Sequence, residues 1–182
     1  LLESAKSGDR RSLARLLTLI EGGEELVLPN VSPWTLGVTG PPGVGKSTLI
    51  GRLVSHWKGS GERVAVLAVD PSSPRSGGAL LADRMRMEST DSGESVYFRS
   101  LATRGHPGGV SYLLSPMIDL LSFCGWSRIV IETVGSGQAE TRVVAFADRV
   151  MMVDGPDRGD IIQAEKAGII ELADIIAINK SD

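Results

Sequence analysis

Residues 35–50 read TLGVTGPPGVGKSTLI, and this stretch decides the fold class. TLGVT is typical of a short buried strand, and the run LIGRLV after it continues a helix. Between them, GPPGVGKST fits the pattern G-x-x-x-x-G-K-[ST]. A strand, a glycine-rich turn of this kind and a helix together form a loop that cradles phosphate groups. The candidate phosphate-binding residues are Gly40, Pro41, Pro42, Gly43, Val44, Gly45, Lys46, Ser47 and Thr48.

Each residue type in this loop has a chemical reason. Glycines let the backbone curl so that its N–H groups point at phosphate oxygens, and the helix N-terminus adds a positive dipole. Lys46 is expected to reach the β- and γ-phosphates and to stabilise charge that develops during their hydrolysis. The Ser47 hydroxyl is a candidate magnesium ligand. The alternative, a glycine-rich turn with no ligand, does not account for the complete motif.

The rest of the chain alternates short apolar strands with helices. Several strands are continuous apolar runs, such as VAVLAV, which suit a parallel sheet buried on both faces. The pattern predicts a doubly wound α/β domain with a mostly parallel sheet. The expected strands are Thr35–Thr39, Val64–Asp70, Val96–Ser100, Arg128–Thr133, Arg149–Val153 and Ile175–Asn179. The expected helices between them are Gly45–His56, Gly78–Ser89, Val110–Cys124, Ala139–Ala147 and Asp160–Leu172.

A helical extension precedes this domain. Leu13, Leu16, Leu17 and Ile20 recur at helical spacing, which predicts an amphipathic helix from about Asp9 to Glu21. Asp9 can cap it, and the glycine pair that follows ends it. We therefore expect a helical extension and linker over residues 1–32 and a phosphate-binding domain over residues 33–182. Because the chain begins at Leu1 and stops directly after an apolar run, we expect a fragment, truncated at its C-terminus.

Composition excludes several classes of protein. The net charge of −3 argues against a general nucleic-acid-binding surface. No apolar run reaches the roughly 18–20 residues of a membrane span, and no signal peptide is recognisable, so we expect a cytoplasmic protein without membrane contact. One cysteine and two histidines leave little for a redox scaffold or a Cys/His metal site.

Residues 179–182, NKSD, fit the N-K-x-D pattern of guanine-binding loops. Guanine offers two adjacent donors, which one carboxylate, that of Asp182, can accept together. Adenine offers no such pair, so Asp182 would be left unpaired, and sites of this kind discriminate by roughly 10⁴-fold. Asn179 can bond the major-groove edge of the base, and the stem of Lys180 can pack over the ring. An ordinary polar turn after a strand is the alternative.

Three carboxylates are candidates for magnesium binding and catalysis. Asp70 and Glu132 each end a predicted strand at the edge that carries the phosphate loop, and Asp83 follows in the run ALLADRMRM. Glu132-x-x-Gly135 has the layout of the D-x-x-G motif of GTPases, in which the acid holds the magnesium shell and the glycine N–H contacts the γ-phosphate. Mg²⁺ prefers about six oxygen ligands and keeps several waters. Helix caps or solvated surface acids are the alternatives.

These segments together resemble the GTPases associated with methylmalonyl-CoA mutase, the family of the MeaB, ArgK and MMAA proteins. The resemblance covers almost the whole chain, and the stretches AVDPSSPRSGGALLADRMRM, VIETVGSGQAE and GDIIQAEKAGIIELAD carry it more specifically than the phosphate loop. The sequence departs from the family pattern at Pro107, Ser136 and Ala139. These departures leave the identity of the partner mutase open.

The resemblance implies a P-loop GTPase that acts as a chaperone for a coenzyme-B12-dependent acyl-CoA mutase and gates delivery or protection of its cobalamin. It implies Mg²⁺ with GTP or GDP, roles for Asp70, Asp83 and Glu132 in magnesium binding and hydrolysis, and a homodimer formed through a C-terminal region absent from this sequence. It also implies that Lys166 is a switch lysine. No general base or arginine finger is evident, so turnover is expected to be slow and stimulated by a partner.

Other residues and functions stay open. Gln138 could orient the attacking water or begin a helix, and His106 is expected to be a loop histidine. Cys124 is expected to be a buried thiol, and Met151 and Met152 to pack in the core. The alternative functions are a GTPase chaperone that inserts nickel and an ATP-dependent kinase that serves transport. The small number of Cys and His residues argues against nickel insertion. Asp182 argues against an ATP-dependent kinase, because adenine cannot donate the hydrogen-bond pair that this carboxylate accepts.

Overall fold

A computed structural model describes residues 1–29, 32–70, 95–102, 111–133, 146–156 and 167–179. Its six strands form one sheet in the order β3-β2-β4-β1-β5-β6, and every neighbouring pair is parallel. The strands are β1 (Trp34–Thr39), β2 (Val64–Asp70), β3 (Val96–Ala102), β4 (Arg128–Thr133), β5 (Arg149–Asp154) and β6 (Ile175–Ile178). The helices are α1 (Leu2–Lys6), α2 (Arg10–Glu21), α3 (Lys46–Gly59), α5 (Ser111–Phe123) and α7 (Ala167–Leu172).

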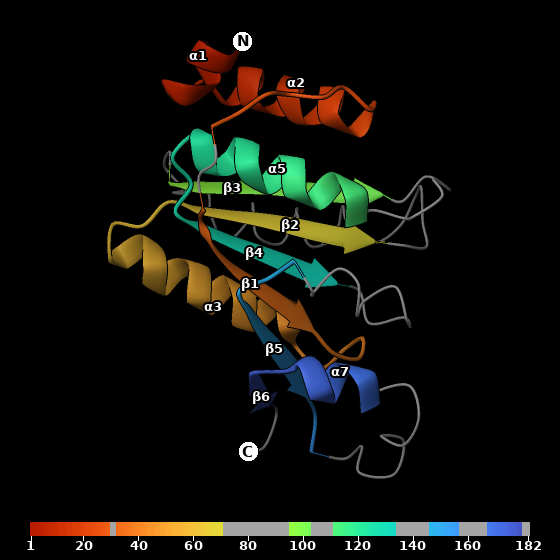
Figure 1. Ribbon diagram of the computed structural model, residues 1–182. Coiled ribbons are helices and arrows are strands. Elements are labelled where there is room, and N and C mark those ends of the chain that lie inside the picture. The colour runs from red at the N-terminus through yellow and green to blue at the C-terminus, as the bar shows by residue number, and fades with distance from the viewer. Residues whose placement is uncertain (30–31, 71–94, 103–110, 134–145, 157–166, 180–182) are drawn as a thin grey trace.

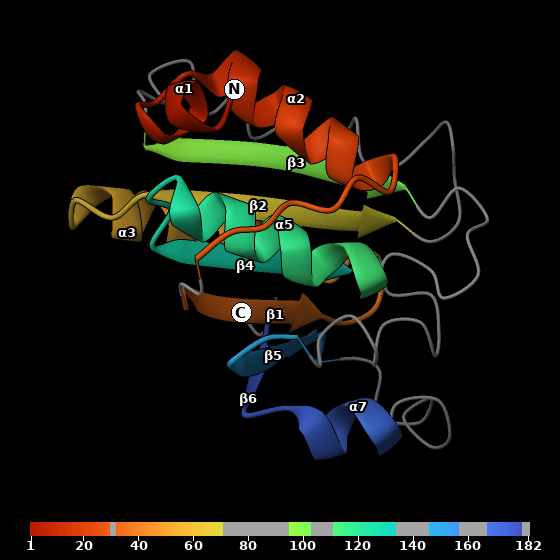
Figure 2. The ribbon, with the colours of Figure 1, turned by 45° about the horizontal axis from the view of Figure 1, so that its top comes forward.

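Helices cover both faces of the sheet. Helix α3 lies on one face, whereas α5, with α1 and α2 beyond it, lies on the other (Figures 1 and 2). This two-sided winding places β1 between β4 and β5, at the point where the chain order reverses. Loops at the carboxyl ends of the strands next to such a switch point form the ligand sites of open α/β sheets. The phosphate loop follows β1 and therefore occupies this position.

Successive side chains of each strand point to opposite faces of the sheet, so the strands contribute to two hydrophobic cores. In β2, Ala65, Leu67 and Val69 pack into the core under α2 and α5, while Val64 and Val66 pack into the core under α3. All five side chains are nearly inaccessible to solvent. A strand buried on both faces reads as an uninterrupted apolar run, as VAVLAV does. The prediction of a doubly wound parallel sheet is confirmed.

The N-terminal helices belong to the larger core. Ala5 of α1 and four apolar side chains of α2 are buried against α5 and the sheet. Asp9 caps α2, since its carboxylate accepts hydrogen bonds from the backbone N–H groups of Arg11 (3.1 Å) and Ser12 (3.3 Å). Gly23, with a φ of 91°, follows the end of the helix. The buried residues of α2 are Ser12, Leu13, Leu16, Leu17 and Ile20.

Several predicted bounds differ from the structure by one to three residues. Strand β3 runs on to Ala102, and α3 continues to Gly59 instead of ending at His56. Strand β6 ends at Ile178, before Asn179, which begins the loop. Helix α1 was not expected, because its five residues are too few to show a periodicity. The predicted helix Gly78–Ser89 lies outside the described residues, as do most of Ala139–Ala147 and the first part of Asp160–Leu172.

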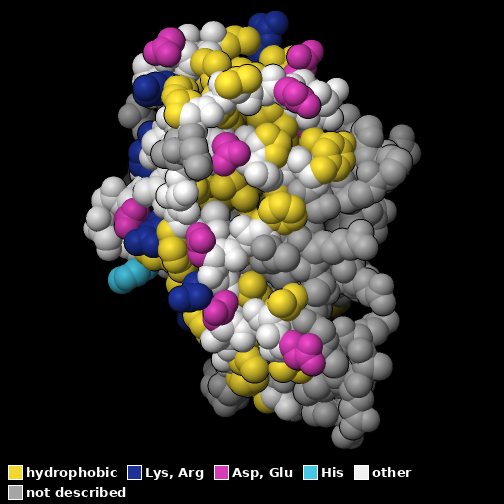
Figure 3. Space-filling model, in the orientation of Figure 1, with side chains coloured by type: hydrophobic (Ala, Val, Ile, Leu, Met, Phe, Trp, Pro, Cys, Tyr) yellow, Lys and Arg dark blue, Asp and Glu magenta, His cyan; other side chains and the backbone are white. Residues whose placement is uncertain are grey.

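The described surface is mixed in character. In Figure 3 acidic side chains are scattered over the visible face, and basic ones lie mostly along the side that holds the amino ends of the strands. At the β6 edge of the sheet, Ile175, Ile176 and Ile178 are exposed. Cys124 and Met152 are buried as expected, whereas Met151 is only partly buried where it packs against the core under α3. Burial raises the pKa of the Cys124 thiol. Within the described ranges, no helix is long and apolar enough to cross a membrane.

Candidate functional site

The phosphate loop leaves β1 at the edge of the sheet where the strands end, and two of its glycines are required by their surroundings. Gly40 has a φ of 139°, and a Cβ atom built there would collide with the backbone carbonyl oxygen of Val153 in β5. Gly45 has a φ of 92°, and its Cβ atom would collide with the side-chain amide of Asn179. Only glycine combines this backbone conformation with so close an approach. The loop is therefore pressed against β5 and against the loop that follows β6.

Lys46, the first residue of α3, is turned onto its own loop. Its side chain is 7% exposed, and Nζ donates hydrogen bonds to the carbonyl oxygens of Gly40 (2.6 Å) and Pro41 (2.9 Å). A buried ammonium group is tolerated only when its protons are accepted in this way. The positive charge is thus already held within the loop where phosphate is expected.

Ser47 and Glu132 meet across the site. The Ser47 hydroxyl donates a hydrogen bond to Oε1 of Glu132 over 3.1 Å, joining the first turn of α3 to the end of β4. Glu132 is 6% exposed, and its other oxygen, Oε2, has no hydrogen-bond partner among the described residues. Burial raises the pKa of Glu132 to about 7, while the Ser47 hydrogen bond and the charge of Lys46 act in the opposite direction. The site thus holds a desolvated carboxylate with one oxygen unused.

This donor set fits a magnesium ion. The Ser47 hydroxyl and the Glu132 carboxylate are hard oxygen donors of the kind Mg²⁺ selects. Oε2 of Glu132 has lost its solvation without gaining a hydrogen bond among the described residues, and a bound cation would remove this cost. Asp70 ends β2, the strand that pairs with β4 such that Ala68 aligns with Glu132. The backbone therefore brings Asp70 to the same sheet edge. Nothing is described of its side chain.

Asn179 connects the predicted base-reading loop to the phosphate loop. Its side-chain Nδ2 donates a hydrogen bond to the carbonyl oxygen of Val44 over 2.8 Å, and its backbone N–H donates to the carbonyl of Asp154, also over 2.8 Å. Sequence reasoning assigned Asn179 to the base alone. The structure adds a second role, since one amide proton of this side chain holds the phosphate loop.

Two polar residues at this edge were not singled out from the sequence. Asp154 ends β5, is 5% exposed, and accepts a hydrogen bond from the backbone N–H of Gly155 (2.9 Å). Thr133 ends β4 and is also buried, and its hydroxyl has no partner among the described residues. The signal that could have found both is the one that found Asp70 and Glu132, a polar side chain at the carboxyl end of an apolar strand.

Several predicted site residues fall on parts of the chain that the structure does not describe. Asp83, Gly135, Lys180 and Asp182 belong to this set, and so do His106, Gln138 and Lys166. Where the chain is described, no group of three or more His, Cys, Asp and Glu side chains could hold a metal ion by itself. The arrangement that is visible combines a buried lysine on a phosphate loop with a serine and a glutamate placed for a cation.

Comparison with known proteins shows what the chain as a whole is similar to. Residues 13–182 match the model of a family described as methylmalonyl-CoA mutase-associated GTPase MeaB. A putative GTPase of Pyrococcus horikoshii is 45% identical over 190 residues, which cover all of this chain and 60% of that protein. The GTPase ArgK of Escherichia coli is 36% identical over 189 residues, covering 97% of this chain and 58% of that protein.

A solved structure shares the fold. The crystal structure of a LAO/AO transport system kinase superimposes with a TM-score of 0.71 at 27% identity, covering the whole chain and 55% of that protein. The chain thus spans about 60% of the length of the curated relatives it matches.

Proposed function

Since this chain belongs to the methylmalonyl-CoA mutase-associated GTPase family, we propose that it binds GTP and hydrolyses it to GDP and phosphate. The observation that carries the proposal is the Lys46–Ser47–Glu132 group at the carboxyl edge of the sheet. A buried ammonium held by the phosphate loop lies there with a hydroxyl that is bonded to a desolvated carboxylate. Such a set of groups serves phosphoryl transfer, in which catalysis is mostly positioning and stabilisation of charge.

The residues have separable roles in this proposal. The backbone N–H groups of Gly43–Thr48 would bind phosphate oxygens, since Pro41 and Pro42 have no N–H to donate. Lys46 would move from the carbonyls of Gly40 and Pro41 to the β- and γ-phosphates. Ser47 and Glu132, with Asp70 and Asp83, would hold Mg²⁺. When bound, Mg²⁺ neutralises charge on the phosphate oxygens. Asn179, Lys180 and Asp182 would bind guanine, and the N–H of Gly135 would contact the γ-phosphate.

We further propose that the GTPase acts on a partner, a cobalamin-dependent acyl-CoA mutase, and gates delivery or protection of its cofactor. The family name supports a mutase partner. The sequence supports a slow intrinsic reaction, because it offers no evident arginine finger. We also propose a cytoplasmic location, a homodimer, and a division into an extension (1–32) and a nucleotide-binding domain (33–182).

The partner is tested by measuring GTP turnover and capture together. The protein, immobilised with a non-hydrolysable GTP analogue or with GDP, is expected to retain a cobalamin-dependent mutase from cell extract in one nucleotide state more than in the other. Addition of that purified mutase is expected to raise the GTP turnover rate. Rapid turnover by the isolated protein that the mutase leaves unchanged would contradict the proposal. A tight nickel site found by titration would favour the metal-insertion alternative.

A further inference from the structure

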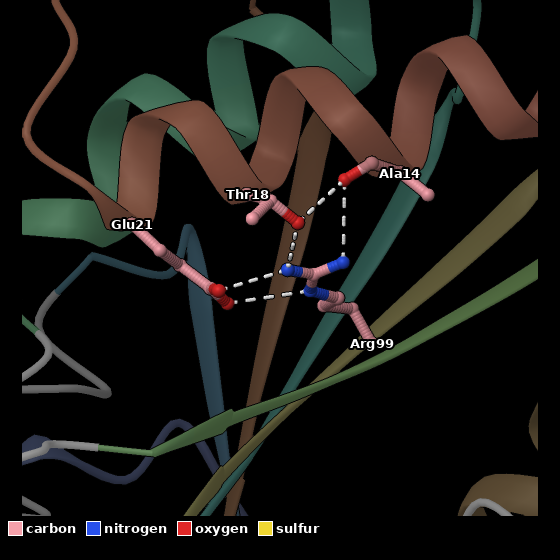
Figure 4. A network of polar contacts seen from close by, with 4 residues as sticks. All are labelled: Ala14, Thr18, Glu21 and Arg99. Atoms are coloured by element: carbon pink, nitrogen blue, oxygen red, sulfur yellow. Dashed lines mark hydrogen bonds and ion pairs between the residues drawn. The ribbon is translucent and has the colours of Figure 1, made fainter.

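Helix α2 is fastened to strand β3 by one arginine. Nε and Nη2 of Arg99 donate hydrogen bonds to the two carboxylate oxygens of Glu21 (3.3 and 2.8 Å), and Nη2 also bonds the Thr18 hydroxyl (2.9 Å). Nη1 reaches the carbonyl oxygen of Ala14 (3.4 Å). Figure 4 shows these four residues, which we call the Arg99 clamp. All three guanidinium nitrogens are used, and only the planar fork of arginine can make this set of bonds.

The clamp is shielded from solvent. The side chains of Arg99 and Glu21 are 19% and 20% exposed, so their attraction is screened less than that of an ordinary surface ion pair. Arg10, at the start of α2, adds a second attachment. It donates a hydrogen bond to the carbonyl oxygen of Val96 and lies over the ring of Tyr97, 5.7 Å from its centroid. Helix α2 therefore holds the amino half of β3, from Val96 to Arg99.

Strand β3 depends on this attachment more than an inner strand would. It lies at one edge of the sheet and, among the described strands, pairs only with β2. Helix α2 lies along it at that edge (Figure 2). The ladder with β2 is in register over seven pairs, from Val64 with Val96 to Asp70 with Ala102. The carboxyl end of β3 is thus tied to Asp70, a residue we place at the magnesium and nucleotide edge.

We propose that the Arg99 clamp couples the N-terminal helices to the nucleotide site, so that docking of α2 and binding of nucleotide strengthen each other. The inference rests on the proposed nucleotide site. The route is α2 to Arg99, Arg99 to the β3 ladder, and the ladder to Asp70. Coupling of this kind is reciprocal: if docking of α2 raises nucleotide affinity by some factor, bound nucleotide favours docking of α2 by the same factor. Arg99 is in this view a positioning residue for the site.

The test measures GDP affinity and hydrogen exchange of α2 in the intact protein and in two variants, Arg99→Lys and Glu21→Gln. In the wild type, GDP is expected to slow amide exchange in α2. In both variants GDP is expected no longer to slow amide exchange in α2, while it still slows amide exchange in β1. Both variants are expected to bind GDP roughly fivefold more weakly than the wild type. The Arg128→Lys variant is the matched control. Arg128 pairs with Glu62 and is more exposed than the clamp pair (30% and 28%, against 19% and 20%). It lies at the amino end of β4, at the other end of the strand from the nucleotide edge.

Two results would overturn the inference alone. One is a wild type that binds GDP with no change in α2 exchange. The other is an Arg99→Lys variant that unfolds at a lower temperature yet binds GDP as tightly as the wild type, which would make the clamp purely structural. A wild type that binds no GDP at all would overturn the proposed function and this inference with it.

Discussion

At the scale of single residues, Glu132 is the described titratable group whose pKa the fold shifts most strongly. Its carboxylate is buried at the end of β4 and receives one hydrogen bond, from Ser47. The charged form is therefore disfavoured while no cation is present, and the pKa of Glu132 rises from 4.5 to about 7. A cation bound beside Oε2 would reverse this preference. The ionised carboxylate thus carries a desolvation cost that a bound cation would offset.

This cost predicts a pH-dependent effect of Glu132→Gln on the metal-free and nucleotide-free protein. Below pH 4.5 the carboxyl is protonated in both the folded and the unfolded chain, so it makes no pH-dependent contribution. As the pH rises from 4.5 through 7, only the unfolded chain readily loses the proton, and the wild type loses about 3 kcal/mol of unfolding free energy. Glutamine cannot ionise, so the Glu132→Gln variant does not lose this unfolding free energy. Urea unfolding near pH 5 and near pH 8 is expected to show the variant gaining most of this amount on the wild type, because part of the loss is already present at pH 5.

Glu62 supplies a control of opposite sign. Hydrogen bonds from Ser127 and Arg128 lower the pKa of Glu62. Its contribution to stability is therefore present above its ordinary pKa and is lost as the pH falls through the lowered value. Glu62→Gln is expected to make no gain on the wild type between pH 5 and pH 8. A Glu132→Gln variant whose stability relative to the wild type is the same at both pH values would contradict the assignment of a buried, unpaired carboxylate.

At the scale of elements, the contact between the phosphate loop and the residue that follows β6 predicts how two glycines of that loop respond to substitution. Gly43 and Gly45 both have positive φ angles, 78° and 92°, but only a Cβ atom at Gly45 meets another residue, the amide of Asn179. Gly43→Ala is expected to cost about 1 kcal/mol of unfolding free energy from backbone strain alone. Gly45→Ala is expected to cost about 1–3 kcal/mol more, measured by urea unfolding without nucleotide.

The Asn179→Ala change isolates the contact. Removing the amide gives the alanine at position 45 room, so Asn179→Ala made in the Gly45→Ala background is expected to be less destabilising than in the wild type. Such non-additivity is what residues in direct contact show. Equal costs for the two glycine variants, or strictly additive effects of Gly45→Ala and Asn179→Ala, would mean that the two loops do not touch as described.

The elements also show which features can be predicted from a sequence. The strands β2 and β4 were predicted with their observed bounds because VAVLAVD and RIVIET are apolar runs flanked by polar residues. The phosphate loop was predicted because its spacing is unusual. The Asn179–Val44 bond was not, because it depends on how the loops after β1 and β6 approach across β5. The Arg99 clamp was missed for the same reason, since it joins residues 78 and 81 positions apart.

At the scale of the whole molecule, the fold gathers polar groups from distant parts of the chain at one edge of the sheet. Lys46 and Ser47 follow β1, Glu132 lies next to the last residue of β4, and Asn179 follows β6. All strands are parallel, so their carboxyl ends share that edge, while the N-terminal helices are fixed to the sheet at β3. The central claim is that this edge binds guanine nucleotide.

The most direct test of that claim is a parallel titration of the protein with GTP and with ATP in the presence of Mg²⁺. GTP is expected to bind and ATP to bind roughly 10⁴-fold more weakly, because adenine cannot donate the hydrogen-bond pair that Asp182 is proposed to accept. The Asp182→Asn variant is expected to shift the preference from guanine toward xanthine nucleotides. Equal or tighter binding of ATP by the wild type would contradict the account.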